Sequence, residues 1–206
     1  LYGKDYNEQT DKFTRIGADM NIKYRLTDWL NLSARNRYNG DFSDRMMYSD
    51  PRDVTGFYYA RKGLLNLNSG RNTNLITTEM LQADKTFGRH RVNGLLGFEY
   101  NKLTSNLQGT SVNGLKPGLK MLSAGDQKTL STRSTIAELA YLSYFSELNY
   151  SYDGRYYATA SFRRDGSSKF GSSNKYGNFY SVSGAWQVSA ESFMREAKAI
   201  DNLRLR

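Results

Sequence analysis

The chain has 206 residues, of which 38% are hydrophobic, 14% aromatic and 24% charged, with a formal net charge of +9 at pH 7. It contains no cysteine, which excludes disulfide-stabilised folds and thiolate chemistry. No stretch approaches the roughly 18 to 20 consecutive apolar residues of a membrane helix, so a helical membrane protein is excluded, and the aromatic content argues against disorder. The segment starts at Leu1 without a Met or a basic-then-apolar leader. We therefore expect a fragment whose export signal lies elsewhere.

The basic residues are too dispersed to indicate nucleic-acid binding. Their densest groups are 61–62, 88–91 and 163–164, and none forms a block of five or six like charges. We therefore expect no nucleic-acid partner.

Alternation of apolar and polar residues is the dominant pattern of the sequence. A period of two residues is typical of a strand with one apolar face. Asp153-Gly154 is a preferred pair for a tight hairpin turn between two such strands, and Glu79 breaks the apolar parity of its own strand. The seven predicted strands are 13–24, 30–38, 75–85, 91–101, 142–152, 156–164 and 179–188.

The connections between these strands alternate in length. Short connections are expected at 26–29, 86–90 and 153–155, and long polar ones at 39–71, 103–131 and 165–178. Short periplasmic turns and long extracellular loops are typical of an outer-membrane β-barrel, whereas a sandwich does not segregate its loops in this way. Aromatic residues gather at the short-turn end, where they could sit among lipid headgroups: Tyr24, Trp29, Phe87, Tyr150, Tyr152, Tyr156 and Trp186.

Beyond Val188 the pattern changes. Residues 189–200 have helical spacing, with Ser189 as a possible N-cap, and predict a short periplasmic helix. Residues 203–206 alternate again, as the start of an eighth strand would.

Catalytic and metal-binding patterns are weak. The single histidine, His90, lies in a predicted turn beside two arginines, and we interpret it as a solvated turn residue. Residues 109–116 resemble a phosphate-binding loop but lack a Lys directly after the second Gly, so we expect a flexible loop. Residues 165–168 lack the carboxylates of a calcium loop. We expect no enzyme activity, no metal and no cofactor.

From Leu142 onward the chain resembles the SusC/RagA-type TonB-dependent outer-membrane transporters. The segments that carry the resemblance are 143–152, 158–171, 180–194 and 203–206, with looser similarity at 27–30 and 85–90. Ser146, Gly184 and Ala185 stand where a Gly, a Leu-like residue and a Gly are expected. These departures leave the barrel assignment intact.

The resemblance implies an all-β fold, in which residues 1–206 are about seven strands of the wall of an antiparallel barrel of 22 strands. The plug domain and the remaining strands would lie outside this segment. It also implies a Gram-negative outer-membrane protein that imports oligosaccharides or peptides, with a SusD-like lipoprotein as lid and TonB as the energy source through the absent N-terminal parts. The sequence does not identify the substrate.

Alternation and loop length divide the candidate residues into three groups. Lumen-facing candidates, which could contact a plug or line the import path, are Lys23, Arg35, Arg37, Glu147, Asn149 and Arg163. Candidates for facing lipid are Ile22, Leu32, Phe98, Leu148, Phe162 and Trp186. Candidates in extracellular loops, where a lid or substrate could dock, are Tyr48, Tyr58, Tyr59, Arg61 and Asn72.

Two alternatives remain open at this point. A free-standing eight-stranded outer-membrane barrel fits the length of the chain. A secreted β-sandwich that binds glycans through surface tyrosines would place the same apolar parity in a core.

Overall fold

The computed structural model describes residues 6–53, 63–171, 175–194 and 200–206. The chain divides into two compact units. The first unit comprises Leu1–Ala18, Tyr38–Asn74 and Leu103–Glu138, and the second comprises Asp19–Arg37, Leu75–Lys102 and Leu139–Arg206. Each unit is therefore built from parts of several strands.

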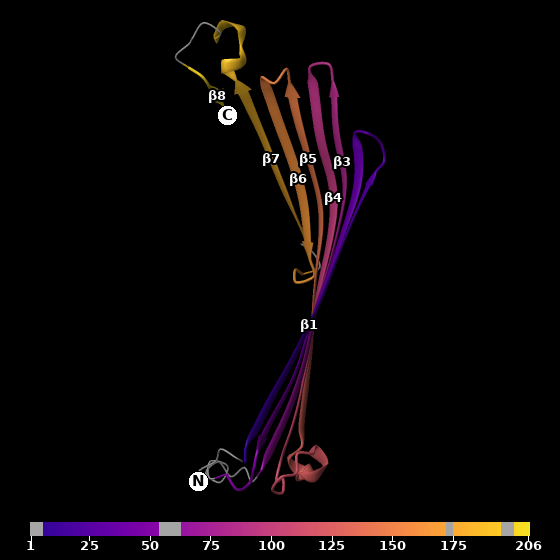
Figure 1. The fold of residues 1–206 in the computed structure, drawn as a ribbon, viewed down its shortest axis with the longest axis vertical. Coiled ribbons are helices and arrows are strands. Elements are labelled where there is room, and N and C mark those ends of the chain that lie inside the picture. The colour runs from indigo at the N-terminus through magenta and orange to yellow at the C-terminus, as the bar shows by residue number, and fades with distance from the viewer. Residues whose placement is uncertain (1–5, 54–62, 172–174, 195–199) are drawn as a thin grey trace. The chain divides into compact units, whose positions relative to one another are not determined.

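The described strands form one sheet in which every strand pairs with its neighbours in the chain. Figure 1 shows β3 to β7 following one another side by side. The pairings of β5 to β8 are antiparallel. The strands are β1 Glu8–Arg25, β2 Leu30–Ser49, β3 Leu64–Phe87, β4 His90–Asn113, β5 Ser131–Tyr152, β6 Tyr156–Ser167, β7 Tyr176–Gln187 and β8 Arg204–Leu205. All seven predicted strands are present, together with the start of the eighth.

Tight turns join alternate pairs of strands, as the sequence predicts. Between β5 and β6, Asp153 and Gly154 have φ values of 53° and 66°, the left-handed conformation of a tight hairpin turn, and the Arg155 amide donates to the Tyr152 carbonyl at 3.0 Å. Gly88 takes a φ of 57° between β3 and β4. In the turn between β1 and β2, the Leu26 amide donates to the Leu30 carbonyl at 2.9 Å.

The strands are longer than the sequence pattern predicts, and the long connections are correspondingly shorter. β2 and β3 are separated by 50–63 instead of 39–71, and β4 and β5 by 114–130 instead of 103–131. Residues 109–113, expected in a flexible loop, are therefore the end of β4. The prediction ended these strands too early because their outer segments carry polar residues on both faces, so hydropathy no longer alternates although the backbone pairing continues.

The segment after β7 also differs from the prediction. In place of one helix over 189–200, the described residues form two 3-10 turns, Val188–Ala190 and Ser192–Met194. Ser189 lies inside the first turn and is not its N-cap. The remainder of the predicted helix, 195–199, lies outside the described residues.

The first unit contains a small apolar core. Tyr48, Leu65, Val112 and Leu115 are buried, and Met46, Leu67, Leu122 and Ala124 pack around them. Leu115, Leu122 and Ala124 belong to the connection 114–130, which therefore folds back onto β2, β3 and β4.

The sheet decides between the fold alternatives. β1 and β8 stand at opposite ends of the strand order and do not pair with each other within the described residues, so the strands do not close into an eight-stranded barrel. They also form a single sheet and not the two facing sheets of a sandwich. Nowhere in the described ranges is there a helix of the length and apolarity needed to cross a membrane.

Candidate functional site

One face of the sheet carries paired charges, and we call it the polar face. In the second unit, Arg37 Nε donates to Asp19 Oδ1 at 2.6 Å, and Arg35 Nε donates to Asn21 Oδ1 at 2.9 Å. These four side chains have the same parity on β1 and β2, and strand neighbours of one parity share a face. Arg37 and Asp19 are about half exposed, so the ion pair is accessible to solvent.

The polar face continues across β3 and β4. Arg91 Nη2 donates to Asp84 Oδ2 at 2.8 Å, and Thr78 Oγ1 donates to Glu99 Oε2 at 3.0 Å. Each contact joins side chains of neighbouring strands, which holds donors and acceptors in fixed positions along the surface.

A further network covers β5 and β6. Asn149 receives a hydrogen bond from Thr159 Oγ1 at 2.8 Å and donates to Glu147 Oε1 at 2.6 Å. Arg163 Nε donates to Asp165 Oδ1 at 2.7 Å, and Arg163 Nη2 donates to Ser143 Oγ at 3.2 Å. The charge of Arg163 is thus matched within its own strand.

The opposite face of the second unit, the apolar face, exposes large hydrophobic side chains. Leu148 pairs with Ala160, which pairs with Val182, and this row continues across three strands. Val182 is 80% exposed and Leu148 50%. Large contiguous apolar surfaces of this kind mark an interaction with a membrane or another protein.

A continuous row of rings lies on this unit at the end with the tight turns. His90 stacks on Phe87 with centroids 5.6 Å apart and approaches Tyr152 at 4.9 Å. The row continues from Tyr152 to Tyr156 and from Tyr156 to Trp186, each at 6.3 Å. Its order follows the strand order from β3 to β7, as an interfacial aromatic girdle does.

His90 therefore differs from the solvated turn residue that its sequence context predicts. Its Nδ1 lies 2.7 Å from the Tyr150 hydroxyl, and its ring is part of the aromatic row. Within the described residues, no group of three His, Asp or Glu side chains could hold a metal ion.

Glu191 fastens the segment after β7 to the turn end of the sheet. The Tyr156 hydroxyl and Trp186 Nε1 donate to Glu191 Oε1 at 2.7 and 3.1 Å, and Arg155 Nη1 donates to Oε2 at 3.1 Å. The hydrogen bond from the Tyr156 hydroxyl, together with that from Trp186, lowers the pKa of the Glu191 carboxyl. Sequence reasoning did not identify this residue, because Arg155 and Tyr156 lie 36 and 35 residues away in the chain and reach it only through the pairing of β6 with β7.

The first unit contains an open cleft of about 670 Å³ lined mainly by polar and charged residues, and we call it the polar cleft. Arg45 Nε donates to Asp11 Oδ1 at 2.5 Å beside the exposed ring of Phe13, over which Arg15 lies at 5.3 Å. Arg133 and Leu107 line the same cleft. The cleft combines apolar surface with charged hydrogen-bonding groups, a composition that suits organic ligands bearing polar substituents.

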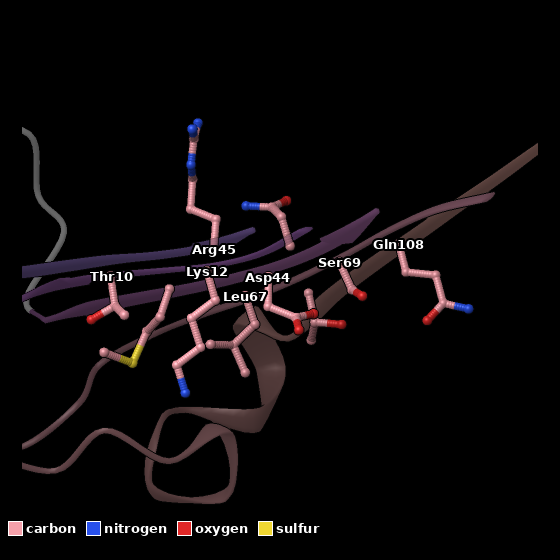
Figure 2. Close-up of a pocket in the computed structure, with 10 residues that line it drawn as sticks. Thr10, Lys12, Asp44, Arg45, Leu67, Ser69 and Gln108 are labelled. Atoms are coloured by element: carbon pink, nitrogen blue, oxygen red, sulfur yellow. The ribbon is translucent and has the colours of Figure 1, made fainter. Parts of the chain in front are cut away.

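A second hollow, of about 390 Å³, lies against the same strands. Figure 2 shows Lys12, Asp44 and Leu67 projecting from one side of the sheet and Arg45 from the other. Lys12 on β1 and Asp44 on β2 have the opposite parity to Asp11 and Arg45, so their side chains mark the opposite face of the sheet.

A clasp of Tyr48, Asp50, Arg52 and Gly118 holds the connection 114–130 in the first unit. The Tyr48 hydroxyl donates to Asp50 Oδ2 at 2.9 Å, and the Gly118 amide donates to the Tyr48 hydroxyl at 2.9 Å. Arg52 Nε donates to Asp50 Oδ1 at 2.8 Å, and this hydrogen bond holds the pKa of the Asp50 carboxyl well below its usual range. Gly118 has a φ of 77°, which favours glycine.

The structure changes the interpretation of the loop candidates. Tyr48 is not an exposed loop residue but the end of β2, and it is 1% exposed because it packs in the core. Asn72 is exposed but lies within β3. Tyr58, Tyr59 and Arg61 lie outside the described residues.

The other sequence candidates fall on the two faces as follows. Arg35, Arg37, Glu147, Asn149 and Arg163 take part in the polar network, and Lys23 is exposed on β1. The apolar candidates are exposed or half-buried on strands of the second unit: Ile22, Leu32, Phe98, Leu148, Phe162 and Trp186.

Opposite polar and apolar faces, an aromatic row at the tight-turn end and longer connections between the remaining strands define the wall of a transmembrane antiparallel β-barrel. The chain matches no protein-family model. It is 30% identical over 155 residues to TonB-dependent receptor P26 of Formosa agariphila, covering 69% of this chain and 16% of that protein. It is 37% identical over 81 residues to TonB-dependent receptor SusC of Bacteroides thetaiotaomicron, covering 39% of this chain and 8% of that protein.

Solved structures show the same similarity. A RagAB peptide transporter superimposes with a TM-score of 0.83 at 25% identity, covering 97% of this chain and 22% of that chain. The RagAB peptide importer in its open-open state superimposes with a TM-score of 0.79, covering 91% of this chain and 21% of that chain. The chain thus spans less than a quarter of the length of these relatives. It belongs to the SusC/RagA-type TonB-dependent transporters and forms part of their barrel wall.

Proposed function

We propose that the complete protein imports oligosaccharides or peptides across the outer membrane of a Gram-negative bacterium. TonB would supply the energy through parts of the protein outside this chain, and a SusD-like lipoprotein would cover the extracellular side. The similarity to SusC and to the RagAB peptide importer supports this assignment. Growth on single carbon sources distinguishes the two substrate classes.

The observation that carries the proposal is the contrast between the two faces of the second unit. The apolar face suits contact with lipid, where a charge at the bilayer midplane costs about 2 to 4 kcal/mol. The polar face suits a hydrated lumen, where ion pairs such as Arg37–Asp19 remain solvated. We therefore assign the lumen-facing and lipid-facing roles to the residues that the sequence pattern suggested for them.

The polar cleft of the first unit is the proposed contact surface for substrate. An exposed ring at Phe13 can cover the apolar side of a sugar or an amino-acid side chain, while Arg45, Asp11 and Arg133 can bind its polar groups. The tight turns of the second unit are assigned to the periplasmic side, and the longer connections, including 114–130, to the extracellular side.

The proposal is tested by growth of the source bacterium on single carbon sources. A strain lacking the gene, a strain lacking TonB and a complemented strain are compared on a panel of oligosaccharides and peptides. The gene deletion should abolish growth on a subset of the substrates that require TonB, and complementation should restore it. Unchanged growth and uptake on every TonB-dependent substrate would contradict the proposal.

Cleft variants extend this test to the present chain. Phe13→Ala and Arg133→Gln in the full-length protein should slow growth on the same subset because both side chains line the cleft. Lys128→Gln, an exposed residue of the connection 114–130, removes one charge away from the cleft and serves as the control. An equal effect of all three substitutions would place the substrate path elsewhere.

A further inference from the structure

Arg164 is a charged residue on the apolar face. On β6 it has the same parity as Ala160 and Phe162, and it pairs with Tyr144 of β5 and Asn178 of β7. Its side chain is exposed. An arginine at such a position is unfavourable in hydrocarbon, so its depth in the membrane decides what it can do.

The depth follows from the aromatic row. Arg164 lies eight residues beyond Tyr156 on β6, which corresponds to about 26 Å along the strand. A strand tilted by roughly 40° rises about 20 Å over that length, and the apolar band of such barrels is about 25 Å tall. A long arginine side chain can extend the remaining few ångströms toward the headgroups. Arg164 therefore marks the far edge of the band.

Glu79 supports this placement. It interrupts the apolar parity of β3, is exposed, and lies eight residues before Phe87 of the aromatic row. On the apolar face of β5, β6 and β7, the described positions between the aromatic row and Arg164 carry no charge. On β3, Lys85 lies next to the aromatic row with its Nζ 4.8 Å from the centroid of the Trp29 ring, and the next charge of this parity is Glu79. Glu79 and Arg164 therefore lie at the same distance from the row.

Arg164 is held on a ring. Its guanidinium lies 4.7 Å from the centroid of Tyr176. The Tyr176 ring in turn fills the space over Gly166, because a Cβ there would be 2.5 Å from Tyr176 Cε1. This glycine–tyrosine–arginine stack restricts a flexible side chain in advance of binding, and a cation over a ring is itself favourable.

Comparison with Arg163 shows what Arg164 lacks. Arg163, on the polar face, lies 5.6 Å from the centroid of the Phe145 ring and donates to the carboxylate of Asp165. Among the described residues, no carboxylate lies within ion-pair distance of Arg164. In the first unit, Arg71 repeats this arrangement over Phe42 at 5.5 Å, again without a described acidic partner.

We propose that Arg164 binds a phosphate group of lipid A in the outer leaflet of the outer membrane. The phosphates of a lipid lie at the edge of the hydrocarbon, and the guanidinium fork binds phosphate through two parallel hydrogen bonds. The Tyr176 ring keeps the fork on the membrane-facing side. The assignment to the outer leaflet rests on the proposed function, which places the tight turns on the periplasmic side. The binding of an anionic lipid group by Arg164 does not depend on that orientation.

The test uses the purified full-length transporter and native mass spectrometry of its bound lipid. Bisphosphorylated lipid A is added to wild type, Arg164→Gln and Lys169→Gln. Lys169 is exposed and lies just beyond β6, so its substitution makes the same change in net charge away from the ring. Loss of a bidentate charged contact should lower lipid A retention about tenfold in Arg164→Gln, while Lys169→Gln stays within about twofold of wild type.

Two further measurements use the wild-type protein, so they do not depend on the folding of a variant. They identify the anionic group that is bound. Wild type should bind fully dephosphorylated lipid A about tenfold more weakly than the bisphosphorylated form. Millimolar inorganic phosphate should not displace the lipid. Equal retention by wild type and Arg164→Gln, equal binding of dephosphorylated lipid A, or displacement by inorganic phosphate would each overturn the proposal. Unchanged growth of the deletion strain on every TonB-dependent substrate, together with the expected lipid A results, would instead count against the proposed function alone.

Discussion

At the scale of single residues, a glycine in a strand can leave room for an aromatic ring to pack against the sheet. Gly97 of β4 lies beneath the Phe145 ring, and a Cβ at this position would overlap that ring. Gly94, three residues earlier on the same strand, has Leu148 Cδ1 as its nearest neighbour at 3.9 Å from the position of a Cβ. Two glycines of one strand thus meet opposite packing conditions.

We expect Gly97→Ala to destabilise the full-length protein by about 1 to 3 kcal/mol, because the Phe145 ring must move to make room for the methyl group. Gly94→Ala should be neutral or slightly stabilising, because a glycine inside a strand costs about 0.5 to 1 kcal/mol relative to alanine. Urea unfolding of the two variants reconstituted in lipid vesicles measures the difference. Equal midpoints would show that the ring does not depend on Gly97.

The two faces of β6 provide a second comparison between neighbouring residues. Ala160 pairs with Leu148 and Val182 on the apolar face, whereas Ser161 Oγ lies 2.8 Å from Ser181 Oγ on the other. Ala160→Arg should impair membrane assembly, because its charge enters hydrocarbon at a cost of about 2 to 4 kcal/mol near the midplane. Ser161→Arg should assemble better because a hydrated lumen can solvate it.

Heat-modifiable, folded protein in isolated outer membranes reports the outcome for both variants. Equal assembly, or the larger loss for Ser161→Arg, would contradict a lipid-facing Ala160.

At the scale of elements, the connection 114–130 is an ordered segment anchored by the clasp and by the apolar core. Asp50 accepts hydrogen bonds from Tyr48, Arg52 and the Gly118 amide. Because its pKa is lower in the folded protein than in the unfolded chain, Asp50 stabilises the fold fully above its unfolded pKa of about 3.9, and this contribution is lost as pH falls through the folded value. The clasp should therefore persist from pH 5 upward.

Asp50→Asn should loosen the connection 114–130, because the amide retains the shape of the side chain but loses the charge that binds Arg52. Hydrogen exchange of peptides covering 114–120 in the full-length protein should become faster, while wild type keeps constant protection between about pH 5 and pH 8 after correction for intrinsic rates. Asp44→Asn, at an exposed residue of β2 six residues before Asp50, is the control. A loss of wild-type protection within this pH range would contradict the role of the carboxylate.

The elements also show how far the sequence alone could lead. Alternation predicted all seven strands because one face is apolar in the second unit, and Asp153-Gly154 predicted its turn because both residues adopt positive φ. Tyr48, Leu65, Val112 and Leu115 were not predicted as a core. They come from segments far apart in the chain and meet only when 114–130 folds back, which no local period encodes.

The candidate site could be predicted in part, because alternation shows which residues share a face but not which residues meet across strands. Face assignments follow from parity, so Arg35, Arg37 and Arg163 could be placed together on the polar side. The acidic partner of Arg163 lies two residues away, but the donors to Glu191 come from β6, β7 and the turn before β6. Only the register between strands brings those donors together.

At the scale of the whole molecule, the positions of the turns and of the aromatic row indicate how the barrel wall is oriented across the membrane. The aromatic row and the tight turns share one end of the second unit, and Glu191 closes that end with hydrogen bonds from Tyr156 and Trp186. Short turns belong to the periplasmic side in outer-membrane barrels, and longer connections to the extracellular side. Orientation is therefore a property that labelling of the intact cell can test.

Single cysteines in the full-length protein should report this orientation. Ser123→Cys places a thiol in the exposed connection 114–130, and Asp28→Cys places one in the exposed turn between β1 and β2. A membrane-impermeant maleimide added to whole cells should label Ser123→Cys at once and Asp28→Cys only after the outer membrane is opened, because the reagent reaches periplasmic turns only through a breached membrane. Detergent-solubilised protein, in which both thiols should react, provides the control for thiol reactivity. Labelling of Asp28→Cys alone on whole cells would reverse the orientation, and it would contradict the binding of lipid A by Arg164 because that lipid belongs to the outer leaflet.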